Sequence, residues 1–169
     1  MLTALRLRPM TAAQFSIWRA RILPGYAAAH LRAGVWSAGE ADSRAAKLIG
    51  NLLPAGVETP GVLLLSAETS DGNSIGMAWL VLDRPRPGAV WIHNIEIFPG
   101  YRGKGYGREL LAAAEQHSLE HGAKEIGLNV FGGNIIARSL YESSGYEISS
   151  LQMRKRLAGT ALTEQPPNE

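Results

Sequence analysis

A glycine-rich stretch, residues 99–108, carries the densest chemical signal in the chain and reads PGYRGKGYGR. It lies between a segment typical of a strand and a helical pattern. The first N–H groups of a helix lack intrahelical acceptors and carry a partial positive charge. The glycines of this stretch let a ligand approach the main chain closely, and Arg102, Lys104 and Arg108 add formal positive charge. Such a loop is suited to a phosphate group.

Three phosphate-binding patterns can be tested against this stretch. The Walker pattern requires Ser or Thr directly after Gly-Lys, where this chain has Gly105. The dinucleotide pattern G-x-G-x-x-G also fails, because Gly103, Gly105 and Gly107 are spaced as G-x-G-x-G. The third pattern, R/Q-x-x-G-x-G/A, is satisfied in full by residues 102–107.

A second segment, residues 134–146, reads NIIARSLYESSGY and is similar to the pattern N-x-x-A-x-x-L-Y-x-x-x-G-F/Y. In this order, the two patterns are hallmarks of the GNAT superfamily of N-acetyltransferases, which the chain resembles over residues 5–157. Residues 52–60 and 129–132 also resemble a subgroup of small bacterial GNAT proteins with no settled substrate.

The resemblance implies acetyl-CoA as the acyl donor and no metal. In the family, the strand corresponding to the one that ends at Ile97 diverges from the next strand, which leaves main-chain groups unpaired. These groups would bind the amides of the pantetheine arm. Arg102 is also expected to fix the loop, and Asn134 to cap a helix as well as contact the donor. The residues expected to bind acetyl-CoA are Ile95, Ile97, Arg102, Gly103, Lys104, Gly105, Tyr106, Gly107, Arg108, Asn134, Ala137 and Tyr141.

The resemblance implies catalytic roles for Tyr141 and Ile97, and Glu96 is a third catalytic candidate from its position on the strand. The phenol of Tyr141 would protonate the departing thiolate, since a phenol (pKa about 10) can donate to a thiolate whose thiol has a pKa of about 8.5. The N–H of Ile97 would polarise the thioester carbonyl. The group that deprotonates the amine stays open: Glu96 is one candidate, His93 and Glu68 are others, and Glu96 could equally be an exposed strand residue.

The acceptor is expected to be a small-molecule amine or a peptide amine, attacked directly because no cysteine exists to carry the acyl group. The N-terminal helices should form the acceptor side, with Tyr26 and Trp36 as pocket candidates and Trp18 as a core residue. Two alternatives are a non-catalytic CoA-binding module and transfer of another acyl group.

The elements that must position these residues follow from periodicity and from turn residues. In the N-terminal part we expect a strand ending at Pro9, a helix that is capped by Thr11 and ends at Pro24-Gly25, and a short helix over residues 26–33. A further helix should run from a capping box at Ser37 and Glu40 to Pro54.

The central part should contain strands over residues 62–67, 75–82 and 90–97. The C-terminal part should contain a helix over 105–121, a strand over 125–130, a helix from Asn134 to Gly145 and a strand over 146–153. This order predicts an α/β chain whose mixed, mostly antiparallel central sheet is, by the resemblance, splayed in the middle and flanked by helices.

Composition supports one domain, expected over residues 1–160, followed by a mobile tail over residues 161–169. The chain has 169 residues and a formal net charge of +2, with basic residues scattered along it, so we expect no nucleic-acid partner. No apolar run is long enough for a membrane span, and a cytoplasmic protein is expected. A homodimer is left open.

Overall fold

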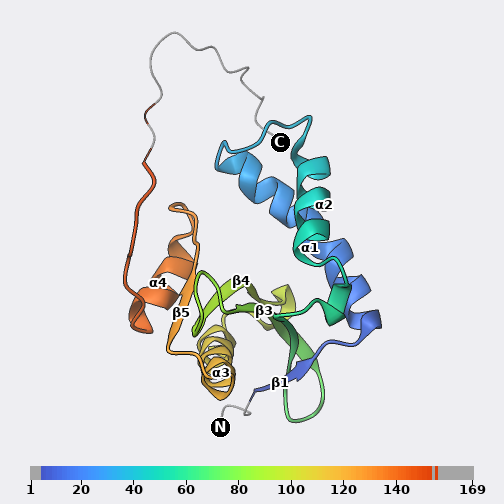
Figure 1. The fold of residues 1–169 in the computed structure, drawn as a ribbon, viewed down its shortest axis with the longest axis vertical. Coiled ribbons are helices and arrows are strands. Elements are labelled where there is room, and N and C mark those ends of the chain that lie inside the picture. Colours follow the sequence, from blue (N-terminus) through green and yellow to red (C-terminus); the bar gives the residue numbers. More distant parts are fainter. Residues whose placement is uncertain (1–4, 154, 156–169) are drawn as a thin grey trace.

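The computed structural model (Figure 1) describes residues 5–153 and residue 155. The strands are β1 (Arg6–Pro9), β2 (Val62–Glu68), β3 (Ser74–Leu82), β4 (Ala89–Ile97) and β5 (Glu125–Leu128). The helices are α1 (Ala12–Arg32), α2 (Ala41–Leu52), α3 (Tyr106–Glu120) and α4 (Ile135–Ser143), with short 3-10 turns at η1 (Gly56–Glu58) and η2 (Pro99–Tyr101). The expected C-terminal tail lies outside the described residues.

The five strands form one sheet in the order β1-β2-β3-β4-β5. The first three pairs are antiparallel and β4 pairs with β5 in parallel, so α3 serves as the crossover connection that a parallel pair requires. The mixed, mostly antiparallel sheet with flanking helices expected from the sequence is confirmed.

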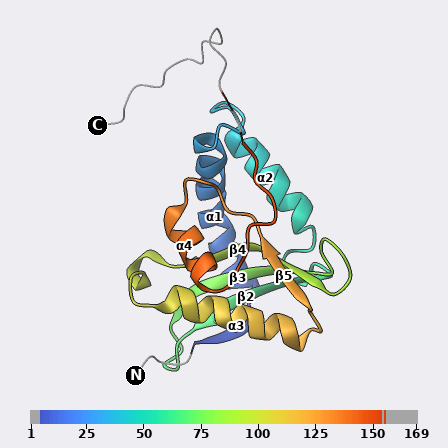
Figure 2. The same cartoon turned by 90° about the vertical axis from the view of Figure 1, so that its left-hand side faces the viewer.

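The sheet is covered on both faces, because α1 and α2 pack on one face and α3 packs on the other (Figures 1 and 2). Leu64, Met77 and Trp79 face α1 and α2, while Leu65 and Ala78, their neighbours along the strands, face α3. Strands covered on both faces must be apolar along their whole length, which explains the continuous apolar run of β2.

Helix α1 differs from its prediction, because it runs without a break through Pro24 and Gly25. Proline normally ends or kinks a helix, since it lacks an N–H group. Here Ile22 and Ala27 are buried on either side of Pro24, and this burial favours one continuous helix. The predicted cap is confirmed, because Thr11 and Gln14 form a reciprocal capping box.

Two other local predictions need correction. Helix α2 begins only at Ala41, and of the predicted capping box just one bond forms, from the Ser37 N–H to the Glu40 carboxylate at 3.4 Å. The predicted strand over residues 146–153 is absent, and Ile148, Leu151 and Met153 along it are exposed. Apolar alternation alone does not make a strand when no neighbouring strand pairs with it.

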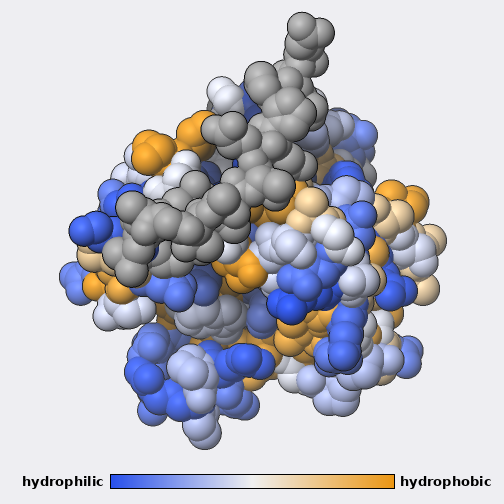
Figure 3. All heavy atoms as spheres, turned by 90° about the horizontal axis from the view of Figure 1, so that it is seen from above, coloured by the Kyte–Doolittle hydropathy of each residue, from blue (hydrophilic) through white to orange (hydrophobic). Residues whose placement is uncertain are grey.

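The surface is mixed in character. On the face shown in Figure 3, hydrophobic residues lie among hydrophilic ones wherever the grey atoms do not cover them. Within the described part of the chain, no helix is both long and apolar enough to cross a membrane.

Candidate active site

The parallel strands β4 and β5 stay together for only half the length of β4. Pairing runs from Ala89 opposite Glu125 to Ile92 opposite Leu128, where β5 ends two residues earlier than predicted. Strand β4 continues to Ile97 and remains paired with β3 on its other side. Residues 93–97 of β4 therefore have an edge that no strand of the described part covers.

A β-bulge lies where the two strands separate. Trp79 of β3 is opposite Asn94, whereas the next residue, Leu80, is opposite Ile92, so His93 is the extra residue of β4. Bulges bend a strand and re-aim its side chains, and they are common beside active sites. The bend comes at the first residue of β4 beyond its pairing with β5.

The main chain at the end of β4 faces this opening. The N–H of Phe98 donates to the carbonyl of Ile75, near the start of β3, at 2.8 Å. Because consecutive N–H groups along a strand point to opposite edges, the N–H groups of Ile97 and Ile95 point away from β3. The side chains of Ile95 and Ile97 pack against the α3-side core, as predicted, so their main chain alone is available to a ligand.

The loop after β4 presents a row of unbonded N–H groups at the start of α3. Gly103 and Gly105 have φ angles of 75° and 87°, a conformation that favours glycine, and Gly105 is the N-cap of α3. The N–H groups of residues 103–107 have no acceptor among the residues that the structure describes, whereas the Arg108 N–H donates to the Gly105 carbonyl at 3.1 Å. A Cβ added at Gly103 or Gly105 would meet no atom within 4 Å, so the loop has room for an anion such as a diphosphate.

Arg102 connects this loop to β4. Its Nε donates to the carbonyl oxygen of Ile97 at 2.8 Å, and a terminal nitrogen donates to the Glu96 carboxylate at 3.3 Å. Lys104 is exposed and lies over the ring of Tyr101 at 5.8 Å. Arg102 thus fixes the loop, as the sequence suggested, and the exposed Lys104 donates from Nζ to the carbonyl of Gly100 at 3.4 Å.

Glu96 is also paired with a residue that the sequence did not single out. Arg21 of α1 lies 3.8 Å from the Glu96 carboxylate, and its guanidinium lies over the ring of Phe98, 3.8 Å from the centroid. The carboxylate therefore lies between Arg21 and Arg102 on the α1 face of the sheet. No sequence signal marked Arg21, because it is one of several arginines on an amphipathic helix.

Helix α4 borders the opening from the α3 side. Asn134 caps it by accepting from the N–H of Ala137 at 3.2 Å, and Arg108 of α3 reaches Ser143 at 3.5 Å. Tyr141 is half-buried, and burial raises the pKa of its phenol above the ordinary value, so the phenol is protonated at neutral pH. Tyr106, the first residue of α3, is also half-buried.

The acceptor-side candidates come together in an aromatic cluster. His30 stacks on Trp36 at 3.9 Å between centroids and lies 4.6 Å from Tyr26. Phe131, in the connection between β5 and α4, meets the His30 ring edge-on at 5.4 Å, which links α1 to the far side of the opening. Trp18 is buried in the core, as predicted. Phe131 was missed, although an aromatic residue directly before two glycines is a recognisable signal.

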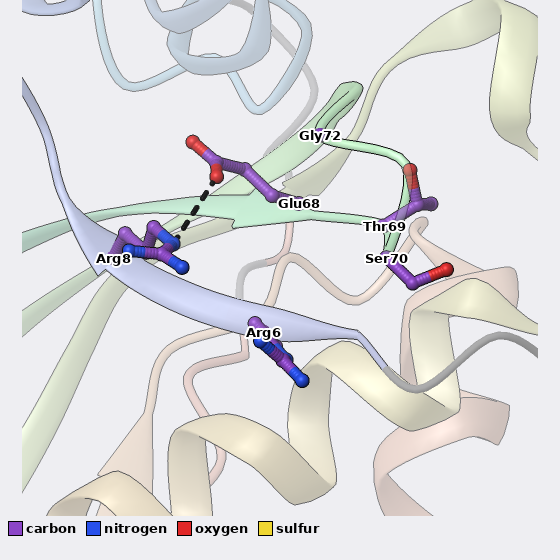
Figure 4. Close-up of a pocket in the computed structure, with 6 residues that line it drawn as sticks. All are labelled: Arg6, Arg8, Glu68, Thr69, Ser70 and Gly72. Carbon is purple, nitrogen blue, oxygen red and sulfur yellow. Dashed lines mark ion pairs between the residues drawn. The ribbon is translucent and has the colours of Figure 1, made fainter.

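Glu68, one of the candidates for deprotonating the amine, lies away from this opening. It belongs to β2, which β3 separates from β4, and it pairs with Arg8 at 3.5 Å. Figure 4 shows both residues lining a pocket of about 70 Å³ at the β1 edge of the sheet. This pocket includes no residue of the glycine loop, so it is separate from the candidate active site.

The mixed sheet, which opens between β4 and β5 and is followed by the glycine loop at the end of β4, has the fold of acetyltransferase structures. The profile of the "Acetyltransferase (GNAT) family" matches residues 28–146, and the chain belongs to this family.

Several individual acetyltransferases are similar to this chain in sequence or in structure. The Bacillus subtilis protein "Uncharacterized N-acetyltransferase YycN" is 31% identical over 89% of this chain and 97% of its own length. The crystal structure of YycN superposes with a TM-score of 0.87, covering 90% of this chain and 98% of YycN. The "Spermine/spermidine N(1)-acetyltransferase" of B. subtilis is 33% identical over 47% of this chain and 56% of its own length. The aminoglycoside N-acetyltransferase AAC(6')-Iy, solved with CoA, shares the fold with a TM-score of 0.58 at 20% identity, covering 94% of this chain and 97% of that protein.

Proposed function

We propose that the protein transfers the acetyl group of acetyl-CoA to a primary amine by direct attack within a ternary complex. The observation that carries this proposal is the row of unbonded N–H groups at residues 103–107, located at the end of a strand whose own free edge lies open. The likeness to AAC(6')-Iy, which was solved with CoA, supports the donor.

The donor would be bound largely by main chain. The N–H groups of Gly103, Gly105 and Gly107, with Arg108, bind the diphosphate, since a helix start favours anions. The outward main-chain groups of Ile95 and Ile97 pair with the amides of the pantetheine arm. Side chains that complete this site are those of Arg102, Lys104, Tyr106, Asn134, Ala137 and Tyr141.

The transfer step needs a polarised carbonyl and a proton for sulfur. The Ile97 N–H polarises the thioester oxygen. Tyr141 keeps its proton at neutral pH because burial raises its pKa, and it donates that proton as the C–S bond breaks. Glu96 contributes to the site through two ion pairs. Its pair with Arg102 connects it to the glycine loop, and its pair with Arg21 connects it to α1.

The acceptor would enter on the α1 face, beside Tyr26 and Trp36. The relative that carries the name of a spermine/spermidine acetyltransferase supports a small-molecule amine. A peptide amine is also compatible with the uncovered edge of β4.

The test is a screen of acceptors with acetyl-CoA, which measures CoA release with small amines, amino acids, polyamines, aminoglycosides and peptides. Calorimetry with CoA is run in parallel. CoA binding together with release that depends on an amine supports the proposal. CoA binding without release would favour a non-catalytic CoA-binding module, and release only with another acyl-CoA would identify a different donor.

A further inference from the structure

We propose that His93 accepts the proton that the acceptor amine must lose before it attacks the thioester. This inference rests on the proposed function and names the group that the sequence left open among three candidates.

The position of His93 is the first support. It is the bulged residue of β4 and directly follows Ile92, the last residue of β4 that pairs with β5. It therefore lies where the opening begins, on the strand whose later residues, Ile95 and Ile97, present their main chain to that opening.

The orientation of its ring is the second support. The imidazole stacks on Trp79 at 4.8 Å between centroids with an interplanar angle of 24°. Trp79 in turn meets Trp18 of α1 edge-on at 5.7 Å. The His93 ring thus lies on the α1 face of the sheet, the face that carries Glu96 and the proposed acceptor side.

The third support is an unmet hydrogen-bonding requirement. The Nε2 atom of His93 is buried and has no hydrogen-bond partner in the described part of the chain, and the same is true of Oδ1 of the adjacent Asn94. Buried polar atoms nearly always have a partner, either protein or water. Two neighbouring unmet atoms at the start of the opening indicate a place for a water molecule or for the acceptor nitrogen.

The charge state of the imidazole fits this role. Burial lowers the pKa of His93, and the positive charge of Arg84 in the β3–β4 turn lowers it further. Its ring is therefore neutral at pH 7 and can take up a proton. On the same face of the sheet, Arg21 of α1 is paired with Glu96.

The other two candidates are engaged elsewhere. The Glu96 carboxylate lies between two arginines, at 3.8 Å from Arg21 and 3.3 Å from Arg102. Glu68 pairs with Arg8 at the opposite edge of the sheet. Of the three, only His93 has a buried side-chain atom that lacks a hydrogen-bond partner among the described residues.

The protons balance as follows. An acceptor ammonium gives one proton to Nε2 of His93, directly or through one water, and the freed lone pair forms the N–C bond. As the C–S bond breaks, sulfur takes the Tyr141 proton, and the second proton leaving the nitrogen restores the phenol. His93 then releases its proton to solvent, so each turnover yields one amide, one thiol and one proton.

The test compares His93→Gln with His121→Gln, the same change at an exposed position on the far end of α3. Two acceptors are used at pH 7: the best alkylamine from the screen, which is protonated, and hydroxylamine, which is mostly unprotonated. We expect His93→Gln to lower kcat with the alkylamine about 100-fold or more and to change kcat with hydroxylamine far less. Equal losses with both acceptors, or no loss, would overturn the role of His93.

A second measurement uses the wild-type protein without any acceptor. The imidazole of His93, one of four histidines, is followed by NMR as the pH is varied. A neutral ring at pH 7 is expected, and a protonated ring at pH 7 would refute the inference. If the wild-type enzyme acetylates no amine, the proposed function itself fails, and this outcome is distinct from loss in the variant alone.

Discussion

Arg102 donates from Nε to the main-chain carbonyl of Ile97 at 2.8 Å, which ties the first residue of the phosphate-binding pattern to the last residue of β4. The same guanidinium reaches Glu96 at 3.3 Å. One planar group thus fixes the distance between the loop that would bind the diphosphate and the main-chain N–H that would polarise the thioester.

Arg102→Lys should weaken CoA binding about tenfold or more, because a lysine cannot donate to Ile97 and Glu96 with the geometry of a guanidinium. Calorimetry with CoA measures the change. Arg44→Lys is the matched control, since Arg44 forms an exposed pair with Glu40 in α2. Equal affinity in wild type and Arg102→Lys would show that the tie is unimportant.

Gly107→Glu should abolish CoA binding without destabilising the fold. Gly107 has an ordinary φ, a Cβ there would lie 3.5 Å from the nearest atom, and an acidic residue in the first turn of a helix is favourable. Calorimetry and thermal unfolding are measured together. Gly107→Gln separates bulk from charge: we expect it to bind CoA more tightly than Gly107→Glu, and the reverse order would contradict a diphosphate site.

Tyr141→Phe should lower kcat about 100-fold or more while the KM for acetyl-CoA changes little, because only proton donation is removed. Tyr146→Phe is the control, since that ring lies 5.7 Å from Tyr141 and is also half-buried. Steady-state kinetics on both variants decide the matter. Equal turnover of Tyr141→Phe and wild type would remove its role as the acid.

Gly76→Ala should reduce the free energy of unfolding by about 1–3 kcal/mol. The added methyl would overlap the carbonyl oxygen of Glu96 and lie 3.3 Å from Cα of Ile97, so β4 would have to shift. Gly50→Ala in α2 meets nothing within 4 Å and should instead stabilise by about 0.5–1 kcal/mol. Urea unfolding of both variants gives the comparison, and a neutral Gly76→Ala would contradict the close approach of β3 and β4.

Stability should fall as the pH falls below about 6.5. Burial lowers the pKa of His93 and of His117 in the folded state, whereas both have the ordinary value of 6.5 when unfolded. Below that value the unfolded chain binds more protons, so acid favours unfolding. Unfolding free energies between about pH 5 and pH 8 test this, and His93→Gln should flatten the dependence. An unchanged slope in that variant would show that His93 does not resist protonation.

The sequence predicted what depends on local pattern. Periodicity and turn residues predicted the strands around Ile97 and the helix after Gly105, and two short motifs predicted the family. The start of helix α1 was predicted but its full length could not be, because its continuation through Pro24 depends on tertiary burial of Ile22 and Ala27.

Contacts between distant segments were also beyond the sequence. The ion pair of Arg21 with Glu96 joins residues 75 positions apart by way of the packing of α1 on the sheet, and no local pattern encodes that distance. The unmet Nε2 of His93 follows from a bulge, which is a property of strand pairing and has no residue signature of its own.

The extra residue at position 93 puts the two halves of β4 out of phase. Ile92 and Ile95 both face α3, although an odd number of steps separates them. Deleting His93 would leave Ile92 and Ile95 two steps apart in a regular ladder, so Glu96 would stay on the α1 face and the Ile97 N–H would still point away from β3. The insertion therefore adds one side chain to the α1 face without turning the remainder of the strand over, and a homologue without it would keep the same main-chain frame but lack a group at this point.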